Sequence, residues 1–280
     1  MAEEARIALF IDFENLALGL QSDNLGGFDV QRILDRLLDK GRIIVKRSYA
    51  DWKRYTKNTA SLHEAGIELI QIPQRRVSGK NSADIRLVVD ALDLCYTKEH
   101  LDTFVIASGD SDFAPLVNKL RENNKTVIGV GLQKSTSRLL SESCDEFLYY
   151  EEIGVSPEPA GRPLSGAPDK AREAFARLLE AILALQRENK GVLWSSLVKD
   201  TMKRKWPDFS EGRYGYHTFS ELLEEAEKLG LIGLTRDMKS GGTYVVTAVH
   251  TRLPGTEGAG KPRRRAPSPK SGRTASRPSA

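Results

Sequence analysis

The chain has 280 residues, of which 40% are hydrophobic and 29% are charged, and its formal net charge is +4. This composition is typical of a soluble globular protein, and no apolar run is long enough to cross a membrane. Residues 250–280 contain eight Lys or Arg and only one acidic residue. The positive charge therefore belongs to this basic tail, which indicates an anionic polymer as a partner.

Neither a secretion signal nor a disulfide framework is predicted. The amino terminus carries Glu3 and Glu4 and lacks a basic segment followed by an apolar core. The two cysteines, Cys95 and Cys144, show no metal-ligand spacing. We therefore expect a cytoplasmic protein with two ordinary thiols.

The first part of the chain alternates between short apolar runs and helical patterns. Strands are predicted at residues 6–12, 42–49, 67–72, 103–108, 126–131 and 147–150. Between them, apolar residues recur at helical spacing, as in Val30, Ile33, Leu34 and Leu37, and Gly41 follows as a carboxyl-end cap would. This alternation predicts an α/β domain over residues 1–154, with a mostly parallel sheet flanked by helices.

The remaining sequence divides into three parts. Residues 155–168 are rich in Pro, Gly and Ala and are interpreted as a linker. Residues 169–249 show three helical stripes and then two short strand patterns, which is a winged-helix arrangement. Residues 250–280 are dominated by Pro, Gly, Ser and Arg, and we expect this basic tail to be disordered.

Acidic residues stand where two of the predicted strands end. Asp12 closes the first strand, and Asp110 and Asp112 follow the fourth. Asp84 opens an apolar stripe of the helix that follows Asn81, where a carboxylate is costly unless something pairs with it. Sites in open α/β sheets form just beyond the carboxyl ends of the strands, so we expect these acids to meet.

Such a cluster of carboxylates suits a hard divalent cation such as Mg²⁺ or Mn²⁺. Asp12, Asp84, Asp110 and Asp112 are the candidate ligands and catalytic residues, and Asn15 is a candidate neutral helper. A bound cation can activate water and clamp a phosphodiester. Simpler roles stay open, because Asp112 also fits a helix cap, Asn15 a turn residue and Asp84 a first-turn acid. Glu14 is left outside the predicted set, and Asp90 and Asp93 are interpreted as solvated.

Basic residues near the predicted site favour a phosphate backbone as substrate. One group follows the second strand, at Lys46, Arg47, Lys53 and Arg54, and another lies in the loop before Asp84, with Arg75, Arg76 and Lys80. In the second domain, basic residues alternate with aromatic ones at residues 203–206 and around Arg213 and Tyr216, which suits base stacking combined with phosphate contact. The aromatic residues also fit packing between helices.

Three stretches of the first domain resemble the motifs of the NYN domain, a branch of the PIN-like nucleases. They are residues 11–15 (IDFEN), residues 82–84 with 89–92 (SAD and VDAL), and residues 108–116 (SGDSDFAPL). The subgroup they most resemble is the bacterial LabA-like group. The resemblance implies a PIN-type Rossmann-like sheet and a Mg²⁺- or Mn²⁺-dependent ribonuclease that uses Asp12, Asp84, Asp110 and Asp112. Asn15 and Ser108 are then expected to contact the substrate.

The second domain resembles the LOTUS domain, also called OST-HTH, which is a winged helix-turn-helix. The similarity lies in Gly215-Tyr216, Phe219, Leu222-Leu223 and Leu229-Gly230. It implies RNA binding, with protein partners as a further role. The leading hypothesis is thus a metal-dependent endoribonuclease, with the LOTUS domain and the tail delivering RNA. The alternatives are a non-catalytic RNA-binding adaptor and, less favoured, a phosphatase acting on small phosphoesters.

Overall fold

The structure, a computed structural model, describes residues 4–23, 25–72, 82–153, 169–238 and 242–250. The predicted linker, all of the basic tail after residue 250, and the loop with Arg75, Arg76 and Lys80 lie outside these residues. In the described chain, no helix is both long enough and apolar enough to span a membrane.

The first domain is built on a six-stranded, entirely parallel sheet with the order β3-β2-β1-β4-β5-β6. Its strands are β1 (Ala5–Asp12), β2 (Gly41–Ala50), β3 (Glu68–Gln71), β4 (Thr103–Ala107), β5 (Thr126–Gly131) and β6 (Glu146–Tyr149). The strand predictions are confirmed to within one or two residues at each end. The order reverses between β1 and β4, and such a switch point is where ligands bind in open α/β sheets.

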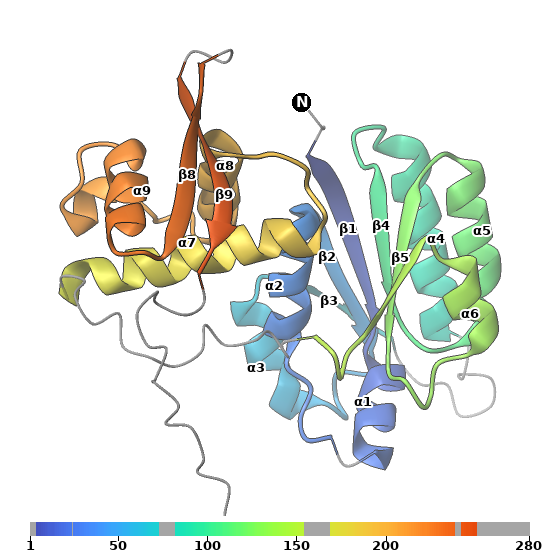
Figure 1. Cartoon of the computed structure of the whole chain (residues 1–280). Coiled ribbons are helices and arrows are strands. Elements are labelled where there is room, and N and C mark those ends of the chain that lie inside the picture. The colour runs from blue at the N-terminus through green and yellow to red at the C-terminus, as the bar shows by residue number, and fades with distance from the viewer. Residues whose placement is uncertain (1–3, 24, 73–81, 154–168, 239–241, 251–280) are drawn as a thin grey trace, which may run out of the picture.

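Helices cover both faces of this sheet (Figure 1). They are α1 (Phe13–Ser22), α2 (Val30–Lys40), α3 (Thr56–Glu64), α4 (Ser82–Thr97), α5 (Ala114–Glu122) and α6 (Arg138–Ser143), with a 3₁₀ turn η1 (Ser111–Phe113) before α5. In β1, Ile7, Leu9 and Ile11 pack with α1 to α3, whereas Ala8 and Phe10 pack with α4 to α6. This alternation produces two separate buried layers, because successive strand residues point to opposite faces.

Gly41 occupies the predicted capping position after α2, where its N–H donates to the Leu37 carbonyl oxygen. Its backbone is extended, with φ −177°, and it does not adopt the left-handed conformation of a glycine cap. A Cβ atom built on Gly41 would lie 2.2 Å from the Ala5 carbonyl oxygen. Glycine is therefore required here by the close approach of β2 to the start of β1.

The second domain has its own buried core. Its elements are α7 (Asp169–Arg187), β7 (Leu193–Trp194), α8 (Ser195–Lys205), the 3₁₀ turn η2 (Glu211–Tyr214), α9 (Phe219–Lys228), β8 (Ile232–Asp237) and β9 (Thr243–Val249). The three helices and the hairpin agree with the sequence pattern. Leu193, expected in the second helix, instead belongs to β7, which joins the hairpin in an antiparallel sheet of order β7-β9-β8.

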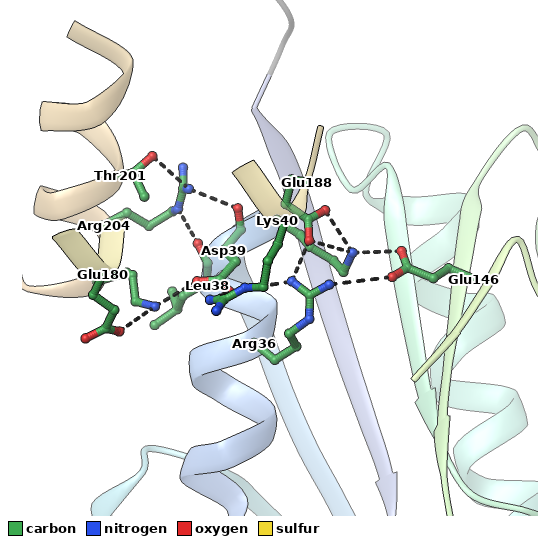
Figure 2. Close-up of polar contacts among 11 residues, drawn as sticks. Arg36, Leu38, Asp39, Lys40, Glu146, Glu180, Glu188, Thr201 and Arg204 are labelled. Carbon is green, nitrogen blue, oxygen red and sulfur yellow. Dashed lines mark hydrogen bonds and ion pairs between the residues drawn. The ribbon is translucent and has the colours of Figure 1, made fainter. Parts of the chain in front are cut away.

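Charged side chains join the two domains where α2 meets α7 and α8 (Figure 2). Asp39 is 2% exposed, and its carboxylate lies 2.7 Å from both the Arg187 guanidinium and the Lys205 ammonium. Glu188 pairs with Arg36 and Lys40. We call these residues the junction cluster, which anchors the second domain to the carboxyl end of α2.

The second domain lies towards the amino ends of the strands, on the side of the sheet that carries α2 (Figure 1). Arg204 of α8 pairs at 2.7 Å with Glu4, immediately before β1, whereas Asp12 ends that strand. An eight-residue strand is about 26 Å long. The acidic strand ends therefore lie at the opposite edge of the sheet from this contact.

Candidate active site

Asp12 stands at the end of β1 and is 5% exposed. Its Oδ2 accepts a hydrogen bond of 2.9 Å from the Ser108 hydroxyl, which follows β4. Its Oδ1 accepts a hydrogen bond from the backbone N–H of Asn15 at 3.4 Å, so the same carboxylate caps α1. The aspartate thus ties together the two strands at which the sheet order reverses.

The turn after β4 is held against the start of α1. The Asn15 side-chain oxygen accepts from the Gly109 N–H at 2.9 Å, and the Asp110 N–H donates to the Ser108 hydroxyl oxygen at 3.2 Å. A Cβ on Gly109 would lie 2.8 Å from the Ser135 carbonyl oxygen, so the turn has no room for a side chain. Asn15 and Ser108, predicted as substrate contacts, therefore position the two acidic segments relative to each other.

Asp110 caps the turn η1 before α5, whereas from the sequence Asp112 was considered as the helix cap. Its Oδ1 accepts from the Asp112 N–H at 3.0 Å and caps η1, while Asp112 lies inside that turn with its side chain exposed. Asp112 consequently does not cap the helix and faces solvent at the carboxyl edge.

Asp84 lies half-buried in the first turn of α4. Burial, followed by the negative charges of Asp110, Asp112 and Glu14, raises its pKa from 3.8 to about 6. Burial likewise raises the pKa of Asp12 to about 7, although the Ser108 hydroxyl acts in the opposite direction. The charges of Asp84 and Asp110 add to this increase. The structure therefore brings the four predicted acids close enough to raise the pKa of two of them.

Glu14 joins this acidic cluster, although the prediction from the sequence left it out. Its carboxylate accepts from the Asp51 N–H at 2.9 Å, beyond the end of β2, and its charge contributes to the raised pKa of Asp84. The sequence feature that could have identified Glu14 is its position in the first turn of α1, directly after a strand that ends in an acid. We call Asp12, Glu14, Asp84, Asp110 and Asp112 the edge cluster.

The interpretation of Asp90 as a solvated residue was wrong. Asp90 is 8% exposed and accepts hydrogen bonds from the Tyr49 hydroxyl at 2.9 Å and from Arg86 at 3.0 Å. Its position relative to Leu87, Ala91 and Leu94 follows the i, i+3, i+4, i+7 pattern of the buried face of α4. That spacing was visible in the sequence.

The edge cluster has the chemistry of a hard-cation site, because carboxylate oxygens are the donors that Mg²⁺ and Mn²⁺ prefer. No described Lys or Arg forms an ion pair with the four predicted aspartates, so their charges are uncompensated within the described chain. Among the residues that the structure places, however, no three His, Cys, Asp or Glu side chains already converge at coordinating distance. The donor types fit a cation, and binding would require these side chains to move closer together.

Two of the four basic residues after the second strand that were predicted to meet phosphate have partners within the protein. Lys46 donates to the Ala65 carbonyl oxygen, and Arg47 pairs with Glu68 at 2.8 Å. Lys53 and Arg54, just beyond β2, are exposed. These two are the described basic residues of that group that are available to a ligand at the carboxyl edge.

Basic and aromatic residues predicted to contact RNA in the second domain also have partners within the protein. The side chains of Arg204 and Lys205 are 9% and 5% exposed and bind the first domain, which excludes them from a free RNA surface in this arrangement. Tyr216 packs against the domain core, with its ring 6.2 Å from that of Phe175. Arg213 is exposed but pairs with Asp208 at 2.8 Å.

A six-stranded parallel sheet flanked by helices, with acids at its switch point, fits a PIN-like domain. The NYN domain model matches residues 6–151, and the chain belongs to the NYN domain family, a branch of the PIN-like nucleases. An uncharacterised protein of Methanocaldococcus jannaschii is 28% identical over 151 residues. The match covers 54% of this chain and 56% of that relative, so the chain spans only about half of the relative's length.

Solved structures resemble the chain at lower similarity. A Vibrio parahaemolyticus protein of unknown function is 22% identical, with a TM-score of 0.48, and the match covers 54% of this chain and 95% of that one. The Aeropyrum pernix ORC1 protein in complex with DNA is 15% identical, with a TM-score of 0.21, and the match covers 88% of this chain and 84% of that one. Neither likeness is close enough to indicate a function.

Proposed function

We propose that this protein is a metal-dependent ribonuclease, most simply an endoribonuclease, whose reaction takes place at the edge cluster. One observation carries the proposal. A buried carboxylate, Asp12, sits at the switch point of an NYN-domain sheet, where burial and then neighbouring acids raise its pKa, and no described cation pairs with it. A site with this much unpaired negative charge favours binding of a cation.

The proposed ligands of a Mg²⁺ or Mn²⁺ ion are Asp12, Asp84, Asp110 and Asp112. When bound, such an ion lowers the pKa of water and neutralises charge on a phosphodiester. Ser108 and Asn15 hold Asp12 and the turn after β4 in register. Asp110 and Asp12 are proposed as direct ligands, while Asp84 and Asp112 complete the site or orient water.

We further propose that the second domain is a LOTUS (OST-HTH) winged helix that binds RNA, and that the first domain is of the LabA-like group. Three helices and an antiparallel sheet support the winged-helix assignment. Helix α9 carries Glu221, Glu224, Glu225 and Glu227, which disfavours it as the phosphate-contacting face. Arg213 and the basic tail are the proposed RNA contacts, and the proposed location is the cytoplasm.

The test is cleavage of end-labelled RNA in the presence of Mn²⁺. Asp12→Asn keeps the size of the side chain and removes its charge. We expect the cleavage rate to fall at least about a hundredfold, because loss of a direct ligand should exceed the roughly 10–100-fold loss typical of residues that only orient a ligand. Asp200→Asn, the same change at an exposed position of α8, is the control and should retain the wild-type rate. Equal cleavage by the Asp12→Asn protein and the wild type would refute the proposal.

A non-catalytic RNA-binding adaptor is the second candidate, favoured by the absence of converged ligands among the described acids. Calorimetric titration with Mn²⁺ separates the two. The nuclease requires heat of binding in the wild type and its loss in Asp12→Asn, whereas RNA binding without any Mn²⁺ uptake would support the adaptor.

A further inference from the structure

The outward face of α4 carries an exposed apolar seam. Ile85, Val89 and Tyr96 are 63%, 56% and 59% exposed, and the partly buried Leu92 lies between the last two. The spacing is i, i+4, i+7 and i+11, which places all four side chains along one line of the helix. Alternating steps of four and three are the pattern by which one helix packs along another.

Ile85, Val89 and Tyr96 stay more than half exposed in the described chain, although the Asn123 side chain after α5 donates a hydrogen bond of 3.3 Å to the Tyr96 hydroxyl. The opposite face of α4, with Leu87, Ala91 and Leu94, is buried against the sheet and neighbouring helices. The second domain docks on α2, across the sheet from α4 (Figure 1). The seam is therefore a surface of the described chain, and it borders a shallow groove lined by Ser82, Ile85, Arg86, Val89, Asp90 and Asp93.

The charges beside the seam indicate which partner fits it. Arg86 and Asp93 are seven residues apart, so they flank the same side of the seam with opposite charges. In an antiparallel pair of α4 helices, Ile85 would face Tyr96 of a second copy and Val89 would face Leu92. Arg86 of each copy would then lie beside Asp93 of the other, twice by symmetry. A surface complementary to itself in both shape and charge is what a two-fold dimer requires.

We propose that the protein forms a homodimer through antiparallel pairing of α4. A helix of 16 residues is about 24 Å long, so one helix pair makes an interface at the small end of the specific range. We therefore expect a weak, reversible dimer, with a dissociation constant on the order of micromolar. Because Asp84 lies at the amino end of α4, the two edge clusters lie at opposite ends of the helix pair and both stay accessible.

Sedimentation velocity of the full chain over a series of micromolar concentrations tests the proposal. The wild type is expected to shift from monomer to dimer as its concentration rises, and Val89→Arg to stay monomeric. The control is Leu139→Arg, the same kind of change at a 61% exposed leucine on α6, which should dimerise like the wild type. A wild type that remains monomeric throughout, or a Val89→Arg protein that dimerises normally, overturns the proposal.

A charge exchange tests the antiparallel register. Arg86→Glu and Asp93→Arg should each weaken self-association at least about tenfold, because like charges then meet across the interface. An equimolar mixture of the two variants should recover a heterodimer, since the introduced glutamate of one copy would meet the introduced arginine of the other. Arg86 also binds Asp90 within its own helix, so circular dichroism must show both variants folded. Folded variants that fail to associate when mixed would refute the pairing.

Discussion

Two clusters of this protein contain buried carboxylates at opposite edges of one sheet, and they differ in whether basic residues pair with those carboxylates. In the junction cluster, Arg36, Lys40, Arg187 and Lys205 surround Asp39 and Glu188. Although burial acts in the opposite direction, Lys40 and Arg36 hold the pKa of Glu188 below its ordinary value. In the edge cluster, burial and neighbouring acids raise the pKa of Asp12 and Asp84.

The difference shows that a buried carboxylate is defined by its partners more than by its exposure. Asp39 and Asp12 are both almost fully buried, at 2% and 5% exposure. The first carboxylate holds two domains together because its charge is matched. The second has no cationic partner among the described residues, so its ionisation costs stability unless a cation binds.

The largest expected change in stability comes from breaking the ion pairs of the junction cluster. Asp39→Asn removes the carboxylate and leaves the nearly buried ammonium of Lys205 without its closest buried partner. We expect the free energy of unfolding to fall by about 3–5 kcal/mol. Urea unfolding followed by circular dichroism measures this loss.

The matched control for the junction is Glu122→Gln, which breaks an exposed pair with Lys119. It should change the free energy of unfolding by less than about 1 kcal/mol. A loss of similar size in the two variants would mean that the junction cluster contributes no more than a surface ion pair.

Removing the Asp12 carboxylate should raise the free energy of unfolding, whereas breaking the junction cluster should lower it. The folded protein keeps the Asp12 proton up to pH about 7, whereas the unfolded chain releases it near pH 3.8. Stability in the absence of metal should therefore fall as the pH rises from about 4 to about 7, and then remain level. Asp12→Asn should flatten this decline and stabilise the protein at pH 8 by at most about 4 kcal/mol.

Thermal unfolding of the wild type and Asp12→Asn at about pH 4.5 and about pH 8, with a chelator present, measures this prediction. The stability that Asp12→Asn gains over the wild type should appear only at the higher pH. A variant that is destabilised at the higher pH would show that the ionised carboxylate contributes favourable interactions that outweigh its burial.

The smallest change in stability is expected from Asn15, whose side-chain oxygen joins the start of α1 to the turn after β4. Asn15→Ala leaves the buried Gly109 N–H without its acceptor and should cost about 1–2 kcal/mol of stability. Asn15→Asp keeps an acceptor oxygen and should retain more of that stability in unfolding measurements. If both variants unfold like the wild type, the Asn15 contact does not hold the turn after β4.

Much of the fold was predictable because its signals are local. Apolar runs such as residues 103–108 have the length of buried strands, and the intervening helical spacing requires crossovers that produce a parallel sheet. The meeting of Asp12 with Asp110 followed from this topology alone. Asp90 was misjudged because the helix face was defined from Asp84 instead of from the neighbouring leucines.

The roles of charged residues were less predictable, because a side chain acquires its partner only after folding. Residues 203–206 have the composition of an RNA contact, yet Arg204 and Lys205 bind Glu4 and Asp39, which lie 200 and 166 positions earlier in the chain. No local pattern reports such a pairing. Arg75, Arg76 and Lys80 remain predictions, since they lie outside the described residues.

The alternation of strands and helices and the positions of acids at strand ends follow from local sequence, because hydrophobic periodicity and residue type act over short distances. Which carboxylates are paired with basic residues and which are not becomes apparent only in the folded protein. That outcome depends on distances and burial between segments far apart in the chain. The difference in partners, and not in residue type, separates the acids that join the domains from those proposed to bind a metal.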